Sequence, residues 1–203
     1  LYSLVISNFS KFNTEKDVQK FIDKKIKEKR LTNAFPTIVA SAKNAFEIHH
    51  KPSDDLLAQG FCYIDFGVRV NGYCSDMTRT VAVGAVSPKL RHMYEAVRKA
   101  QEIGCQKAKA GMTGQELDAV CRKSLKKSGI GKYFTHSTGH GIGMEVHELP
   151  VVSPHPTPSR VSPLEKGERQ NRLPAGAVVT IEPGVYIPNV GGVRIEDALV
   201  LMK

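Results

Sequence analysis

The chain has 203 residues, of which 41% are hydrophobic and 24% charged, a balance typical of a globular protein with one sizeable core. No apolar run approaches the roughly 20 residues that cross a bilayer, so the composition argues against a membrane-spanning protein. The net charge of +9 comes from basic residues spread over 16–30, 89–109 and 122–132. That spread favours solvated helix faces and disfavours a nucleic-acid-binding surface.

The first ten residues, LYSLVISNFS, begin with Leu1 and lack the features of a signal peptide. They are typical of the end of a helix, so we expect 1–203 to be one domain from which a preceding N-terminal domain is missing. The four cysteines show no CxxC spacing, which argues against a four-cysteine zinc site and predicts reduced thiols in a cytoplasmic protein.

The first predicted elements are a helix and a strand. Thr14 and Asp17 have capping-box spacing, and apolar residues recur on one face of the helix that follows to residue 30. A strand is predicted over 37–41. The polar, proline-containing segment 44–52 indicates a loop.

A β-hairpin is predicted over 61–83, because the turn pair Asn71-Gly72 separates two strand-like runs. A two-residue turn places Val70 opposite Tyr73 and, in the same register, Asp65 opposite Thr78. Asp65 and Asp76 then lie on one face as diagonal neighbours, roughly 7–8 Å apart, so their carboxylates can converge on a shared ion or ion pair.

Two helices are predicted next, over 88–110 and from Thr113, where Glu116 completes a second capping box. The glycine-rich segment 136–148 indicates a strand that other backbone approaches closely. The four prolines of Val152–Arg172 predict an irregular loop of unassigned role.

A second hairpin is predicted around Asn189. Glu182 lies seven residues before Asn189 and Glu196 seven after it, so the two glutamates should face each other. This hairpin resembles the first one, since Ile-Glu-Pro-Gly at 181–184 matches Ile-Asp-Phe-Gly at 64–67. The repeat indicates two related halves.

The four acids of the hairpins could be two solvent-facing pairs, but apolar neighbours on both sides of Asp65 and Glu182 indicate buried strands. Buried carboxylates need partners, and four together repel strongly unless cations are present. Two divalent ions would balance the four negative charges. His140, between two glycines, adds an imidazole to a ligand set that suits manganese, iron, cobalt or zinc.

Four sequence blocks carry a family resemblance: IDFG with GYCSDMTRT, HSTGHGIGMEVHE, TIEPGVY and GGVRIED. They resemble the signature blocks of the pita-bread metallopeptidases, which include aminopeptidase P, prolidase and methionine aminopeptidase. The resemblance runs from about Thr37 to the C-terminus. It implies an α+β fold with a curved, mostly antiparallel sheet, outer helices and pseudo-twofold halves.

The resemblance also implies a centre of two divalent metal ions, with manganese favoured over cobalt, zinc or iron. Asp65 would bind one metal, His140 and Glu182 the other, and Asp76 and Glu196 would bridge the two. A hydroxide between the metals would attack the scissile carbonyl, and Glu182 would carry the proton to the leaving nitrogen.

Further side chains match positions near the substrate in this family. His49 and His147 match two accessory histidines that stabilise the intermediate. His136, Tyr186 and Arg194 match substrate-side positions of the Xaa-Pro branch, with support of the metal ligands as the alternative role.

The segment NAFEIHHKP resembles the proline-specific branch, because methionine aminopeptidases usually carry Cys-His-Gly there. We therefore expect hydrolysis of Xaa-Pro bonds, as an aminopeptidase or a dipeptidase acting on a peptide substrate. Methionine aminopeptidase is the first alternative, and a non-catalytic module that binds protein or RNA is the second. A homodimer is left open.

Overall fold

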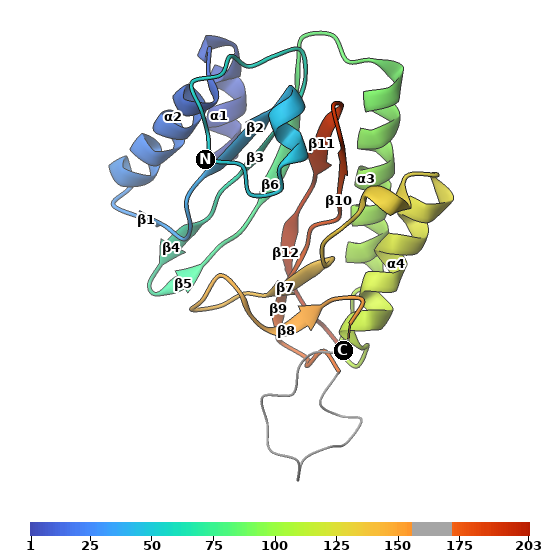
Figure 1. The fold of residues 1–203 in the computed structure, drawn as a ribbon. Coiled ribbons are helices and arrows are strands. Elements are labelled where there is room, and N and C mark those ends of the chain that lie inside the picture. Colours follow the sequence, from blue (N-terminus) through green and yellow to red (C-terminus); the bar gives the residue numbers. More distant parts are fainter. Residues whose placement is uncertain (156–171) are drawn as a thin grey trace.

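The structure is a computed structural model that describes residues 1–155 and 172–203 (Figure 1). Every strand ladder in the described ranges is antiparallel. The α-helices are α1 (Tyr2–Asn8), α2 (Glu15–Glu28), α3 (Pro88–Lys107) and α4 (Gly114–Lys127), and the 3-10 helices are η1 (Phe9–Lys11), η2 (Ala42–Phe46) and η3 (Gly131–Tyr133). The architecture is therefore α+β, as predicted.

Within residues 1–155 and 172–203, the strands form four small sheets, in the orders β1-β4-β5, β2-β3-β6, β12-β9-β7-β8 and β10-β11. Their bounds are β1 (Thr32–Asn33), β2 (Ile38–Ser41), β3 (Gly60–Asp65), β4 (Val68–Val70), β5 (Tyr73–Cys74), β6 (Thr78–Val83), β7 (Gly139–Gly141), β8 (Glu148–Val152), β9 (Val178–Ile181), β10 (Gly184–Ile187), β11 (Gly191–Arg194) and β12 (Asp197–Val200).

Both predicted capping boxes are confirmed. The Thr14 hydroxyl accepts a hydrogen bond from the Asp17 amide, and the Asp17 carboxylate accepts one from the Thr14 amide, at 3.1 and 2.9 Å. Thr113 and Glu116 make the same pair of bonds at the start of α4. These bonds satisfy amides that have no partner within the helix.

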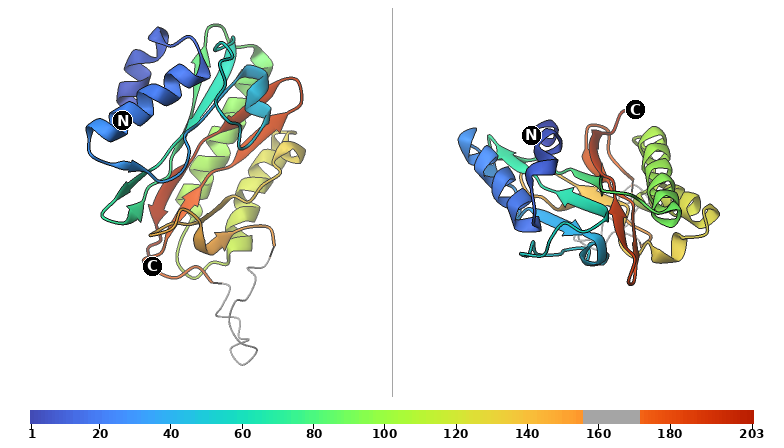
Figure 2. Two further views of the ribbon diagram at one scale, coloured as in Figure 1. Left: turned by 60° about the vertical axis from the view of Figure 1, so that its left-hand side comes forward. Right: turned by 90° about the horizontal axis from the view of Figure 1, so that it is seen from above.

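Two helix pairs flank the strands, α1 and α2 on one side and α3 and α4 on the other (Figure 2). Val18 and Ile22 of α2 belong to one buried cluster with Ile64 of β3. Val97 of α3 belongs to a second cluster with Ile181 of β9. Each half of the chain thus covers its own hairpin with its own helices.

The predicted register of the first hairpin is confirmed. Val70 pairs with Tyr73, and Asp65 pairs with Thr78. The ladder is interrupted between these two pairs, where a Cβ atom on Gly67 would lie 1.8 Å from the Ser75 carbonyl oxygen. The second strand therefore comes too close at Gly67 for any side chain there.

The predicted register of the second hairpin is also confirmed. Gly184 pairs with Arg194 on one side of the glutamates, and Ile181 pairs with Asp197 on the other. Continuing the β10–β11 ladder by two residues, or the β9–β12 ladder by one residue, sets Glu182 opposite Glu196. The ladder break contains Asp76 in the first hairpin and both Glu182 and Glu196 in the second.

The prediction for 136–148 was wrong in its extent, because only Gly139–Gly141 and Glu148 are strand residues. Residues 142–147 leave the sheet and contact the first hairpin. The Cys74 amide donates to the Gly143 carbonyl at 2.7 Å, and Arg69 Nη1 donates to the Met144 carbonyl at 2.7 Å. Similarly, the predicted loop 44–52 begins within η2.

Of the proline-rich segment Val152–Arg172, residues 156–171 lie outside the described ranges. Val152 ends β8, and Arg172 forms an isolated bridge with Thr113. The four cysteines are free thiols. Among the described residues, none of the helices has the length and apolar character needed to cross a membrane.

Candidate metal centre

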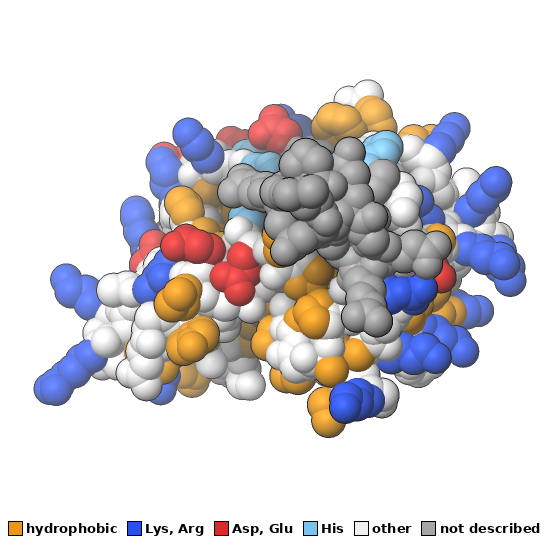
Figure 3. Space-filling view, turned by 90° about the horizontal axis from the view of Figure 1, so that it is seen from below, with side chains coloured by type: hydrophobic (Ala, Val, Ile, Leu, Met, Phe, Trp, Pro, Cys, Tyr) orange, Lys and Arg blue, Asp and Glu red, His pale blue; other side chains and the backbone are white. Residues whose placement is uncertain are grey.

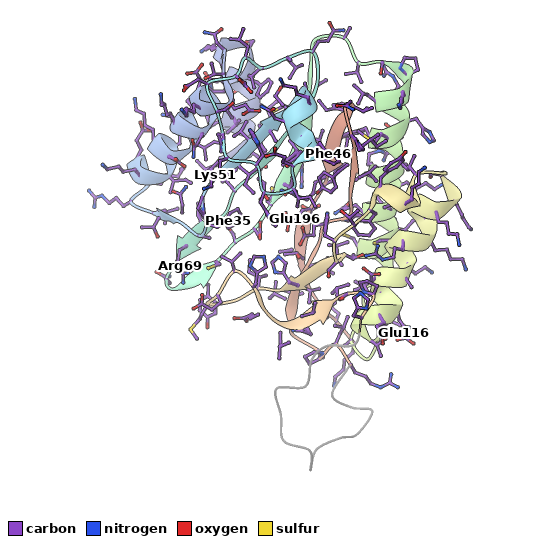
Figure 4. All side chains as sticks on the ribbon, viewed as in Figure 1. Phe35, Phe46, Lys51, Arg69, Glu116 and Glu196 are labelled. Carbon is purple, nitrogen blue, oxygen red and sulfur yellow. The ribbon has the colours of Figure 1, made fainter. Side chains whose placement is uncertain are left out.

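A cavity of about 1190 Å³ lies between the two hairpins. Its wall includes every predicted site residue except Tyr186: His49, Asp65, Asp76, His136, His140, His147, Glu182, Arg194 and Glu196. Figure 4 shows Glu196 near the middle of the fold, where the two halves meet. The structure therefore brings residues that are up to 147 positions apart, from His49 to Glu196, to one cavity.

The tightest group consists of Asp76, His140 and Glu196, whose ligand atoms all lie within 4.8 Å of one another. His140 Nε2 is 3.8 Å from Asp76 Oδ2 and 3.3 Å from Glu182 Oε1. One imidazole nitrogen thus faces carboxylates from both hairpins.

The His140 ring is held in a defined orientation. Its Nδ1 lies 3.0 Å from the Gly141 carbonyl oxygen, which can only accept, so Nδ1 carries the proton and Nε2 keeps a free lone pair. Burial lowers the pKa of His140 to about 4, although the bond to Gly141 opposes this shift. The imidazole is therefore neutral at pH 7, as a metal ligand must be.

The carboxylates have acceptor atoms without donors. Asp65 Oδ1 and Asp76 Oδ1 are buried and have no hydrogen-bond partner among the described residues. Burial, followed by repulsion from Glu196 and Asp65, raises the pKa of Asp76 to about 9. Burial and the charge of Asp65 raise the pKa of Glu196 to about 8, and burial also raises that of Glu182 well above its usual range.

Such a group of acids must either hold protons or face cations. Orphaned carboxylate oxygens beside a neutral imidazole form an oxygen-rich set with one nitrogen, which suits divalent manganese, iron, cobalt or zinc. The residues present therefore fit a divalent-metal site.

A chain of hydrogen bonds links Asp65 to His136 through Arg194 and Tyr186. Arg194 Nη2 lies 2.6 Å from Asp65 Oδ2, and Arg194 Nη1 donates to the Tyr186 hydroxyl at 2.9 Å. The same hydroxyl lies 3.0 Å from His136 Nε2. Burial, then the charge of Arg194, lowers the pKa of His136 to about 3, so this ring is neutral. Tyr186 thus lies behind the wall as a link between Arg194 and His136.

Two threonines that we did not predict support the acids. The Thr78 hydroxyl donates to Glu196 Oε2 at 2.6 Å. The Thr180 hydroxyl accepts from the His140 amide at 3.0 Å and lies 3.4 Å from Glu182 Oε1. Thr78 was detectable, because the predicted register already placed it opposite Asp65 on the same face.

The two predicted accessory histidines are the exposed members of the group. His49 and His147 both line the cavity, and the His147 ring lies 4.2 Å from that of His140 between centroids. Neither is tied by a hydrogen bond among the described residues, so both rings are accessible from the cavity.

The fold and the site define a class, a two-hairpin α+β protein with a carboxylate-rich metal site between its halves. The chain belongs to the metallopeptidase family M24, whose sequence profile matches residues 3–203. It is 47% identical over 173 residues to the uncharacterized peptidase YqhT of Bacillus subtilis, covering 85% of this chain and 45% of that protein. It is 43% identical over 171 residues to the Xaa-Pro dipeptidase of Pyrococcus furiosus, covering 84% and 45%.

The solved structure of the prolidase from Pyrococcus furiosus superposes with a TM-score of 0.86 at 37% identity, covering 98% of this chain and 57% of that one. The predicted pita-bread fold is thereby confirmed, as is the resemblance to the Xaa-Pro branch. The chain spans about half the length of these relatives.

Proposed function

We propose that residues 1–203 form the catalytic domain of a metal-dependent exopeptidase that hydrolyses Xaa-Pro bonds, as an Xaa-Pro aminopeptidase or an Xaa-Pro dipeptidase. The observation that carries this proposal is the convergence of Asp76, His140 and Glu196 within 4.8 Å, beside two buried carboxylate oxygens without donors. The similarity to a protein named Xaa-Pro dipeptidase supports the substrate class. The free cysteines support a cytoplasmic location.

Two divalent ions, with manganese favoured, would be held by Asp65, Asp76, His140, Glu182 and Glu196. When bound, they would supply a water molecule of lowered pKa and polarise the scissile carbonyl. Two ions match the charge of four carboxylates. Asp65 has one oxygen bonded to Arg194 and one oxygen without a donor in the described part of the chain, which supports its assignment to a single metal.

Glu182 would also move a proton, and the side chains that do not bind metal would contact the substrate. The Glu182 side chain is 17% exposed and faces the cavity, so its carboxylate can take a proton and deliver it to the leaving nitrogen. His49 and His147, which line the cavity, would donate hydrogen bonds to the carbonyl oxygen as negative charge develops there. His136, held by Tyr186, would contact the peptide from a third side.

The shape of the cavity is compatible with a peptide. Its volume of about 1190 Å³ exceeds what a metal site needs, and its wall continues over Phe35, Ile38 and Ile48. Apolar groups beside a polar centre suit a proline ring and a short peptide backbone.

Basic side chains project along both flanks of the face in Figure 3. This spread supports solvated surface lysines and arginines and argues against a nucleic-acid interface.

The test is hydrolysis of Xaa-Pro dipeptides, longer Xaa-Pro peptides and Met-Ala-Ser by the purified protein, with manganese or cobalt and with a chelated control. We expect metal-dependent cleavage before proline, and the peptide lengths accepted will separate the aminopeptidase from the dipeptidase. Cleavage after methionine alone would instead assign a methionine aminopeptidase. Two bound metals without any cleavage would favour a binding role.

A further inference from the structure

Glu15 is a buried carboxylate that the proposed mechanism does not use. It is the first residue of α2 and its exposed fraction is 0%. Oε1 accepts from the Ser41 amide at 2.8 Å and from Asn44 Nδ2 at 3.1 Å. Oε2 lies 2.8 Å from His50 Nε2 and accepts from the Ser53 amide and hydroxyl, each at 3.0 Å. Both oxygens are therefore saturated with donors.

All of these donors belong to one segment, 41–53, which we call the histidine loop because it carries His49 and His50. Burying a carboxylate is costly unless several donors compensate it. A helix start needs only a cap, which Thr14 already supplies to α2. The network around Glu15 thus fastens both ends of the histidine loop to α2.

The middle of the histidine loop faces the metal centre. His49 lines the cavity, and the Ile48 carbonyl accepts from Arg194 Nη1 at 3.1 Å. The Tyr63 hydroxyl donates to the neighbouring Glu47 carbonyl. The loop is therefore held from two sides, by Glu15 at its ends and by Arg194 and Tyr63 at its centre.

We propose that Glu15 is a positioning residue that holds His49 against the metal centre by clamping the ends of the histidine loop. The proposal rests on the proposed function, because it assigns Glu15 an effect on the same reaction. Glu15 contacts none of the predicted metal ligands and does not itself line the cavity, although its partner His50 does. It acts through the loop backbone and His50.

The principal variant is Glu15→Gln, which preserves shape. Whichever way the amide is turned, its NH₂ group faces donors, either those of Ser41 and Asn44 or those of His50 and Ser53. We expect kcat/KM on an Xaa-Pro peptide to fall about 10- to 100-fold, mostly through kcat, the scale of losing charged hydrogen bonds that hold a catalytic group. His50→Gln keeps the other donors of Glu15 and should give a smaller loss.

The discriminating measurement is a double-mutant cycle. If Glu15 acts through His49, adding Glu15→Gln to His49→Ala should lower kcat/KM by less than about 2-fold, because the group being positioned is already gone. Asp17→Ala is the matched control: it removes the carboxylate half of the capping box of the same helix, and that carboxylate bonds only to the Asn13 and Thr14 amides, outside the histidine loop. Its kcat/KM should stay within about 2-fold of the wild-type value.

A second readout does not depend on activity. In metal-free protein, amide hydrogen exchange over 47–53 should accelerate in Glu15→Gln and stay unchanged in Asp17→Ala. An unchanged exchange rate in Glu15→Gln would contradict the proposal. A double mutant whose loss in kcat/KM equals the product of the two single losses would contradict it as well. An inactive wild-type protein would overturn the proposed function instead, and the exchange data would still decide the clamp. If Glu15→Gln does not fold, amide hydrogen exchange over 47–53 in His50→Gln decides the clamp, because His50 itself lines the cavity and its activity readout is not specific.

Discussion

Arg194 and Asp65 come from different hairpins, and Arg194 Nη2 lies 2.6 Å from Asp65 Oδ2. Arg194 is 2% exposed and also donates to Thr78, Tyr186 and Ile48. This single guanidinium therefore joins the two halves of the chain at the edge of the metal centre. Without Arg194, the buried Asp65 carboxylate would lose its cationic partner.

Arg194→Gln should lower the free energy of unfolding of the metal-free protein by about 3–5 kcal/mol, the scale for breaking one side of a buried ion pair. Urea denaturation measures this change. With saturating manganese the loss should shrink, because bound cations then compensate Asp65. The exposed pair of Arg98 with Glu95 provides the control, since Arg98→Gln should cost at most about 1 kcal/mol. Equal losses in the two variants would contradict the central role of Arg194.

Asp76→Asn should abolish metal-dependent hydrolysis and reduce metal content while the fold survives. Because burial and the neighbouring acids raise the pKa of Asp76 to about 9, the metal-free fold must take up a proton there at pH 7, a cost that the neutral asparagine avoids. The melting temperature of the chelated variant should therefore equal or exceed that of the chelated wild type. Added manganese should raise the melting temperature of the wild type only. Full activity in the variant would contradict the bridging assignment.

The stability contributed by His50 should decline as pH rises above 6.5. Burial lowers its pKa, but the hydrogen bonds that the ring donates to Glu15 and Glu47 outweigh burial, so the folded-state pKa lies above the ordinary value of 6.5. Glu15, Glu47 and Asp55 are the acids that face the ring. A raised folded-state pKa stabilises the fold fully below the unfolded-state pKa and loses its effect as pH passes the folded-state value.

The stability difference between wild type and His50→Gln should therefore be largest near pH 6 and should narrow toward alkaline pH. Chemical denaturation of chelated protein across that interval measures it. A difference that widens with pH would show that His50 is neutral in the folded protein.

Gly139→Ala should disrupt the metal centre through backbone crowding. A Cβ atom at this position would lie 1.9 Å from the Thr180 carbonyl oxygen, so β7 and β9 would have to separate. We expect a loss of about 1–3 kcal/mol in stability, the usual range for overpacking, together with weaker manganese binding, because His140 follows directly. At Gly72 no atom lies within 4 Å, so Gly72→Ala should leave manganese binding unchanged and cost only its positive-φ strain. Equal manganese affinity in the two variants would contradict this account.

The parts of the site that could be predicted are those that depend on local chemistry. The turn at Asn71-Gly72 and the loop at Asn189 set the registers that place Asp65 opposite Thr78 and Glu182 opposite Glu196. Capping boxes are equally local, since they need only a side chain and an amide three residues apart.

The rest depends on packing between distant segments. Nothing near residues 142–147 indicates that Arg69 and Cys74 draw this segment out of the sheet. The hydrogen bonds of Glu15 could not be predicted from the sequence either. Their donors lie 26 to 38 residues away and include backbone amides, which every residue type except proline carries. Side-chain ligands are encoded by residue type, whereas the contacts that position them arise only in the folded chain.

The most direct test of the metal centre is anomalous diffraction from crystals grown with manganese, recorded on both sides of the manganese absorption edge. Two anomalous peaks enclosed by Asp65, Asp76, His140, Glu182 and Glu196 are the expected result. A single peak, or peaks away from these five side chains, would contradict the two-metal centre on which the proposed peptidase activity depends.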